Sequence, residues 1–182
     1  SNGHISPVFY SVLARSGYFK IEELNTFRKL NTRLQGHPTT HEGLPGVRIA
    51  SGSLGQGMSV AIGAALSKKL NNDNGLVFSL HGDGELQEGQ IWESLVSAVN
   101  SRMSELTVVV DHNKLQSDTL VTKVSDLGDL EAKFRSFGWY VTRCEGNNLE
   151  SFSGALAEVK LVSDKPKIII ADTIKGKGVS FM

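Results

Sequence analysis

The stretch His81-Gly-Asp-Gly-Glu-Leu-Gln-Glu-Gly89 decides the fold of this chain. The apolar run at residues 76–80 is typical of a buried strand, residues 89–100 have the apolar face of a helix, and residues 106–110 are typical of a second strand. Such a strand–helix–strand unit is right-handed, so its two strands lie parallel in one sheet. The pattern therefore predicts an α/β fold with a mostly parallel sheet.

Polar side chains follow both of these strands. Asp83 comes after the first, and Asn113 comes after the second. Ligands of open α/β sheets bind at the carboxyl ends of the strands, where a carboxylate and an amide oxygen suit a hard divalent cation such as Mg2+. Gly82 and Gly84 allow a diphosphate to approach the backbone. A lone Gly-Asp-Gly is also compatible with an ordinary turn, but together with Asn113 it predicts a metal–diphosphate site.

A second glycine-rich segment lies upstream. Ser51-Gly-Ser-Leu-Gly-Gln-Gly57 leads into an Ala- and Gly-rich helical stretch at residues 58–70. Main-chain N–H groups at the positive end of a helix can face an anion, so this segment is a second candidate for binding diphosphate. A flexible loop before a buried helix is the alternative interpretation.

The remaining pattern alternates helices and apolar strands. Helices are predicted at residues 7–16, 21–30, 127–137 and 149–162, and strands at 139–145 and 167–172. This alternation predicts a mostly parallel sheet covered by helices on both faces, in a single domain spanning residues 1–182. The stretch at residues 31–47 is long for a connection in a compact domain, which is typical of a functional loop.

The amino-acid composition excludes some classes of function but does not identify one. The 182 residues are 40% hydrophobic, which is enough for one sizeable core. Nineteen basic and nineteen acidic residues give a formal charge of zero, which argues against binding to nucleic acid or to an anionic membrane. The single cysteine, Cys144, excludes an intramolecular disulfide and a cysteine-based zinc cluster, and it favours a cytoplasmic location.

Eight short motifs give the chain a family resemblance along nearly its whole length. In order, they resemble the thiamine-diphosphate-binding domain of transketolase: Ser1-Asn-Gly-His-Ile-Ser-Pro7, Leu34-Gln-Gly-His-Pro38, Leu44-Pro-Gly46, Gly52-Ser-Leu-Gly-Gln-Gly57, Gly82-Asp-Gly-Glu-Leu-Gln-Glu-Gly89, Asp111-His-Asn113, Phe137-Gly-Trp139 and Thr173-Ile-Lys-Gly-Lys-Gly178. The resemblance implies the diphosphate-binding half of the thiamine-diphosphate-binding fold. It also implies thiamine diphosphate as cofactor and the transfer of a two-carbon ketol unit from a ketose phosphate to an aldose phosphate.

The resemblance assigns ligands residue by residue. It implies a metal ion, Mg2+ or Ca2+, held by Asp83, Asn113 and the main-chain carbonyl of Leu115. The positions that match the lining of the cofactor are His4, Gly52, Leu54, Gly84, Glu85, Asn113 and Lys175. For Lys175, a solvated basic loop is the alternative.

The resemblance implies catalytic roles for His4, His37 and Glu88. Imidazole suits the two histidine positions because it donates or accepts a proton near neutral pH. From the residues alone, His4 is compatible with a loop, His37 with a turn before a proline, and Glu88 with an acid in the first turn of a helix. No functional role is expected for His41, His81 and His112, although His81 stands where the family more often has an apolar residue.

The family's second cofactor-binding domain has no counterpart in this sequence. We therefore expect the chain to be inactive alone and to need a C-terminal transketolase subunit that carries the pyrimidine-binding domain, in a heterotetramer. The residues of these motifs resemble the split form of the enzyme and favour a natural split subunit whose native chain extends beyond both ends. A fragment of a full-length enzyme is the alternative. Sugar phosphates are the expected substrates, with the pentose phosphate pathway as the default setting.

Two other functions are compatible with parts of the sequence. Another thiamine-diphosphate enzyme, such as a deoxyxylulose-phosphate synthase or a 2-oxo-acid dehydrogenase component, shares Gly-Asp-Gly and the asparagine but lacks the Leu-Gln-Glu-Gly continuation and the two histidine motifs. A noncatalytic homologue that binds the diphosphate is the alternative from a different class. It is disfavoured because the expected residues of the diphosphate-binding half are all present.

Overall fold

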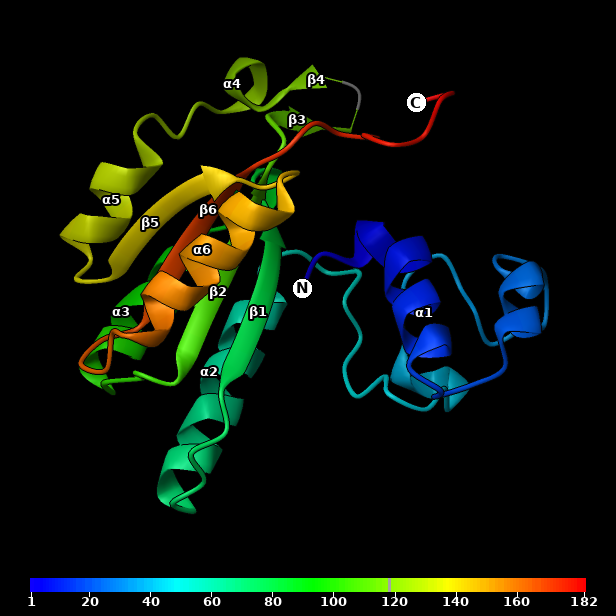
Figure 1. Ribbon diagram of the computed structural model, residues 1–182, viewed down its shortest axis with the longest axis horizontal. Helices are drawn as coiled ribbons and strands as arrows, with labels where there is room; N and C mark the ends of the chain where they lie inside the picture. Colours follow the sequence, from blue (N-terminus) through cyan, green and yellow to red (C-terminus); the bar gives the residue numbers. More distant parts are fainter. Residues whose placement is uncertain (118) are drawn as a thin grey trace. The chain divides into compact units, whose positions relative to one another are not determined.

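The computed structural model describes residues 1–117 and 119–182. The chain divides into two compact units, Ser1–Leu54 and Gly55–Met182, and each is described by itself (Figure 1). Within the described residues, no helix combines the length and the apolar character needed to cross a membrane.

The larger unit is built on a four-stranded sheet whose strands are all parallel. In spatial order they are β1 (Val77–Gly82), β2 (Leu106–His112), β6 (Lys167–Asp172) and β5 (Tyr140–Glu145). The register aligns the carboxyl ends, since Gly82 lies opposite Asp111 and His112 lies opposite Asp172. A separate antiparallel pair, β3 (Leu115–Gln116) and β4 (Thr119–Leu120), follows β2.

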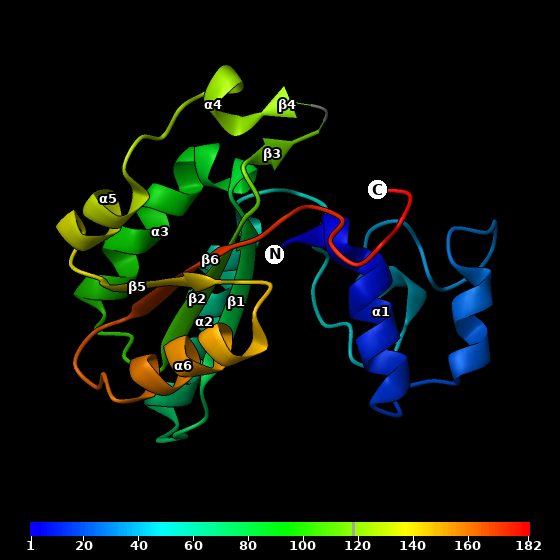
Figure 2. The same ribbon diagram turned by 45° about the horizontal axis from the view of Figure 1, so that its top comes forward.

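Helices cover both faces of this sheet (Figure 2). On one face, α2 (Gln56–Leu70), α3 (Gly89–Asn100) and α5 (Leu130–Ser136) contribute to the largest apolar core, together with Ile168 and Ile170 of β6. On the other face, α6 (Leu149–Lys160) packs on Ile169. Successive strand residues point to opposite faces, so the run Ile168 to Ile170 is buried on both sides, as expected of a central parallel strand. The predicted fold class is confirmed.

The smaller unit consists of α1 (Ser6–Arg15) and three short 3-10 helices, η1 (Gly3–Ile5), η2 (Ile21–Thr26) and η3 (Thr40–Glu42). Its core is formed by Tyr10, Leu34 and Leu44. Two side chains of α1 hold the long loop, because Ser6 Oγ donates to the carbonyl of Gly36 at 2.6 Å and Tyr10 Oη donates to that of Gln35 at 3.0 Å. The loop is thus anchored by partly buried hydrogen bonds.

The helix predicted at residues 21–30 is wrong in type and length. The chain forms a 3-10 helix over Ile21–Thr26, and Arg28 then adopts a left-handed conformation with φ of 58°. This turn allows Arg28 N–H to donate to the carbonyl of Leu34 at 2.8 Å. The conformation of Arg28 therefore ends the helix and folds the following segment back.

Candidate cofactor and metal site

The turn after β1 is fixed to the end of β2 by Asp83. Asp83 is 3% exposed, and its carboxylate accepts the main-chain N–H of Gly84 at 2.8 Å and that of Lys114 at 2.5 Å. Its own N–H donates to the carbonyl of Asp111 at 3.2 Å. The Asp83 side chain therefore lies at the carboxyl ends of two neighbouring parallel strands, where the sequence predicted it.

Asn113 lies at the same edge of the sheet, immediately after β2. Its Oδ1 accepts the N–H of Leu115 at 2.9 Å, and its Nδ2 donates to the Asp111 carboxylate at 3.3 Å. The other carboxylate oxygen of Asp111 accepts a hydrogen bond from Thr173 Oγ1. Asn113 is thus oriented by Asp111, and Asp111 is held in turn by Thr173, the residue that follows β6.

The chemistry of these groups fits a hard divalent cation. Burial raises the pKa of the Asp83 carboxyl, an effect that the N–H groups of Lys114 and Gly84 partly offset, so a nearby cation would stabilise the ionised form. Among the described residues, no cluster of three or more His, Cys, Asp or Glu is placed to hold a metal. A carboxylate and an amide oxygen at this edge of the sheet would leave several coordination positions to phosphate oxygens and water, as Mg2+ prefers.

Gly84 is required by a close approach within this site. A Cβ on Gly84 would lie 2.9 Å from Cβ of Gln116, which belongs to β3. Any side chain here would push β3 away from the turn that carries Asp83. This contact is a steric reason for glycine at position 84, and the predicted approach of a diphosphate to Gly84 stays a prediction.

The other predicted residues are placed as follows. In the smaller unit, the rings of His4 and His37 meet edge to face with centroids 5.3 Å apart, and a Cβ on Gly52 would be in contact with His37 at 3.4 Å. In the larger unit, Glu88 is the exposed N-cap residue of α3. The Lys175 Nζ donates to the carbonyl of Ser117 at 3.4 Å.

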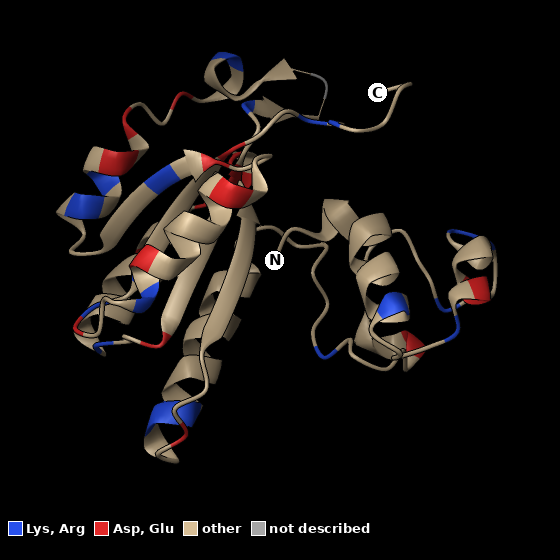
Figure 3. Cartoon of the chain, viewed as in Figure 1, with Lys and Arg blue, Asp and Glu red and all other residues tan. Residues whose placement is uncertain are grey.

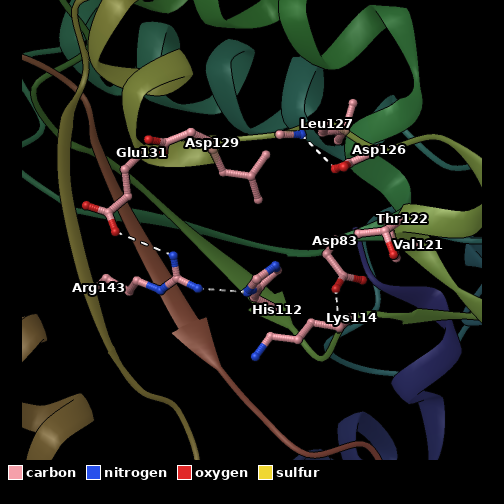
Figure 4. A pocket seen from close by; sticks show the side chains of 12 residues that line it. Asp83, His112, Lys114, Val121, Thr122, Asp126, Leu127, Asp129, Glu131 and Arg143 are labelled. Atoms are coloured by element: carbon pink, nitrogen blue, oxygen red, sulfur yellow. Dashed lines mark hydrogen bonds and ion pairs between the residues drawn. The ribbon is translucent and has the colours of Figure 1, made fainter.

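A charged network that sequence reasoning missed joins the carboxyl ends of β2, β5 and β6. Arg143 donates to both oxygens of Asp172, at 2.6 and 2.9 Å, and His112 Nδ1 lies 2.8 Å from the same carboxylate. Arg143 Nη1 also lies 3.5 Å from Glu131. Arg143, His112 and Glu131 line a pocket of about 550 Å3 that also contains Asp83 (Figure 4). The only signal in the sequence was a charged residue near the end of each predicted strand.

Asp172→Asn is expected to destabilise the chain by roughly 1–2 kcal/mol near pH 7, since it weakens hydrogen bonds to a charged, partly exposed partner. The Arg143 guanidinium, with His112, holds the pKa of Asp172 well below its usual range. Stability from a depressed carboxyl pKa is present above the unfolded-state value, about 3.9, and is lost as the pH falls below it.

Denaturant titration of wild-type and Asp172→Asn protein at several pH values measures this effect. The difference in unfolding free energy should shrink steadily below about pH 4. The control is Asp164→Asn, because Asp164 is 70% exposed and pairs only with Lys165, at 3.4 Å, in the contacts the structure describes. An Asp172→Asn effect of equal size at pH 7 and pH 3 would contradict the assignment.

Comparison with known proteins agrees with this geometry. The family model for the transketolase thiamine diphosphate binding domain matches residues 1–181. The chain is 39% identical to a 6-deoxy-6-sulfo-D-fructose transketolase subunit of Clostridium sp. (strain MSTE9), covering 100% of this chain and 66% of the relative. It is 35% identical to an apulose-4-phosphate transketolase subunit of Actinobacillus succinogenes, covering 100% of this chain and 65% of that relative.

Solved structures agree. Transketolase from Leishmania mexicana superimposes with a TM-score of 0.90 at 30% identity, covering 99% of this chain and 28% of that one. Transketolase from Campylobacter jejuni gives a TM-score of 0.88 at 32% identity, covering 98% of this chain and 29% of that one. The chain spans about two thirds of the curated subunits it matches, at 66% and 65%. On sequence and fold together, the chain belongs to the family of transketolase thiamine-diphosphate-binding domains.

Proposed function

We propose that this chain binds the metal and diphosphate of thiamine diphosphate and, with a partner, transfers a two-carbon ketol unit between sugar phosphates. The observation that supports this most is the placement of Asp83 and Asn113 at the ends of adjacent parallel strands, in a chain that the family model matches over residues 1–181. Both units would serve this one function as a single domain, as the sequence predicted.

The metal is proposed to be Mg2+ or Ca2+, bound by Asp83, by Asn113 and by the main-chain carbonyl of Leu115. Oxygen donors of this kind suit either ion. The cofactor would be lined by His4, Gly52, Leu54, Gly84, Glu85, Asn113 and Lys175. When bound, thiamine diphosphate supplies carbanion stabilisation, which no protein side chain provides. The chain's own contribution is to hold the diphosphate end and to place proton-transfer groups, with His4, His37 and Glu88 as the proposed catalytic residues.

The partner is proposed to be a C-terminal transketolase subunit that supplies the pyrimidine-binding domain, in a heterotetramer. Two relatives that are named as transketolase subunits support this proposal. This chain covers about two thirds of the length of each. A cytoplasmic location and a role in the pentose phosphate pathway stay predictions.

The decisive experiment is reconstitution. The chain, in the full length of its native form, is mixed with the C-terminal subunit from the same source, thiamine diphosphate and Mg2+, and ketol transfer is measured with ketose phosphate donors. We expect activity in the mixture and none in either component. Activity of this chain alone, or a mixture that consumes only pyruvate or another 2-oxo acid, would reject the proposal.

His37→Ala is expected to lower the turnover of the reconstituted enzyme by about 100-fold, because general acid–base groups contribute factors of this size. The affinity for thiamine diphosphate, measured by calorimetry, should change much less. His41→Ala is the matched control, since His41 is an exposed histidine of the same loop, within η3. Equal losses of turnover and cofactor affinity would argue against a catalytic role for His37.

A further inference from the structure

A line of buried polar groups runs beneath the turn that carries Asp83. Ser79 and His81 point to the same face of β1, and Ser79 Oγ lies 2.7 Å from His81 Nε2. His81 Nδ1 lies 3.2 Å from Glu85 Oε2, in an ion-pair contact rather than a well-aligned hydrogen bond. Glu85 Oε1 accepts the main-chain N–H of Gly55 at 2.8 Å. We call these groups, Ser79, His81, Glu85 and the N–H of Gly55, the polar relay. Its side chains are buried, with Ser79 6%, His81 0% and Glu85 2% exposed.

The far end of the relay is the start of α2. Gly55 is the N-cap residue of this helix and has a φ of 82°, a conformation that favours glycine. The charged side chains of α2, Lys68 and Lys69, lie only near its carboxyl-terminal end (Figure 3). Glu85 Oε1 therefore supplies a hydrogen-bond acceptor at the amino-terminal end of the helix, where main-chain N–H groups concentrate. The glycine-rich segment is held at Gly55 by this internal acceptor.

Burying the polar groups of this relay costs folding free energy, so its position next to the Asp83 turn needs a reason other than stability. Burying a carboxylate and an imidazole is unfavourable unless their contacts compensate, and apolar residues of similar volume often serve stability equally well. Leu86, which follows Glu85 in the sequence, is a fully buried residue of the apolar core, so buried apolar side chains are already accommodated in this turn. Stability alone therefore gives little reason for a histidine and a glutamate here.

His81 and Glu85 stand two residues before and two residues after Asp83. The relay consequently bridges the metal-site turn on its buried side and connects it to the glycine-rich segment at Gly55. We propose that His81 is a positioning residue: it orients Glu85, which fixes the start of α2 relative to the turn that carries Asp83. The inference rests on the proposed binding of thiamine diphosphate, and it assigns to His81 a role that needs no contact with the cofactor.

The test compares cofactor affinity with stability in the reconstituted complex. Calorimetry with thiamine diphosphate and Mg2+ gives the affinity, and thermal unfolding gives the stability. His81→Leu and Glu85→Leu should each weaken the affinity by roughly 10- to 100-fold, the range seen when supporting groups of metal sites are removed. His81→Asn keeps a donor near the position of Nδ1, so it should bind within about threefold of wild type.

The double variant His81→Leu/Glu85→Leu separates positioning from folding. Because neither polar partner is left buried without the other, it should unfold at a higher temperature than either single leucine variant, yet its cofactor affinity should stay at least about tenfold weaker than wild type. In this variant the amide of Gly55 should also exchange hydrogen faster than in wild type. Ser94→Ala is the control, because Ser94 is also buried but bonds to Ser59 outside the relay.

The outcomes distinguish this inference from the proposed function. A wild-type complex that does not bind thiamine diphosphate would reject the proposed function. A wild-type complex that binds, together with a double variant that binds equally well, would overturn the positioning role. The positioning role would also be overturned if affinity and stability fell together in the two single leucine variants and recovered together in the double variant.

Discussion

Asp83→Asn is expected to abolish metal-dependent binding of thiamine diphosphate by the reconstituted complex, with a loss of affinity of at least about 100-fold. Asp83 is the proposed metal site's one charged side chain. Its two oxygens also accept the N–H groups of Gly84 and Lys114. Asparagine has one acceptor oxygen and an NH2 group, so one of these main-chain donors would face another donor.

Calorimetry with and without a metal chelator measures this loss. The matched control is Asp126→Asn, because Asp126 lines the same pocket but is bonded to the N–H of Gly128 within its own turn. That variant should bind the cofactor nearly as well as wild type. Unchanged, chelator-sensitive binding by Asp83→Asn would count decisively against the site.

The stability of Asp83→Asn in the absence of metal gives a second readout. Because burial raises the pKa of Asp83, the ionised carboxylate is less favourable in the metal-free fold than in the unfolded chain. Removing the charge should therefore offset part of the cost of the main-chain donor that asparagine leaves unpaired. The unfolding temperature of the metal-free chain should stay within about 2–4 °C of wild type, the shift that corresponds to roughly 1 kcal/mol for a chain of this size. Lost binding with retained stability would place the effect at the metal site.

The larger unit was predictable because its signals are local and repeated. The apolar run of β6 and the apolar faces of the helices predicted a parallel sheet covered on both sides. Asp83 and Asn113 were predictable as neighbours because parallel strands align their carboxyl ends. These inferences needed only the order of the elements.

The features that were missed depend on local conformation or on contacts between distant residues. The left-handed turn that ends η2 is at Arg28 and not at a glycine, so the sequence does not predict it. The two-residue strands β3 and β4 are too short to show an alternation of apolar and polar residues. The relay joins Glu85 to Gly55, and the charged network joins Arg143 to His112. Only the fold brings these groups together, so no role for His81 or His112 could be expected from the sequence.

Gly3→Ala is expected to lower ketol-transfer activity of the reconstituted enzyme by about 100-fold through the geometry of the histidine pair. Gly3 is buried, and a Cβ on it would collide with the main-chain carbonyl of Ser51 and lie 2.9 Å from Cδ2 of His37. A main-chain carbonyl cannot move as a side chain can, so the segment carrying His4 must shift away from His37. The overpacked smaller unit should also lose about 1–3 kcal/mol of stability.

Gly63→Ala provides the contrast for this prediction. A Cβ on Gly63 meets nothing within 4 Å, and Gly63 lies in the interior of α2, where alanine is favoured over glycine by about 1 kcal/mol. It should therefore keep full activity and match or exceed wild-type stability. Steady-state kinetics and thermal unfolding of the two variants separate the steric effect from the general effect of adding a methyl group. Full activity of Gly3→Ala would mean that the approach of Gly3 to Ser51 and His37 is not needed for catalysis.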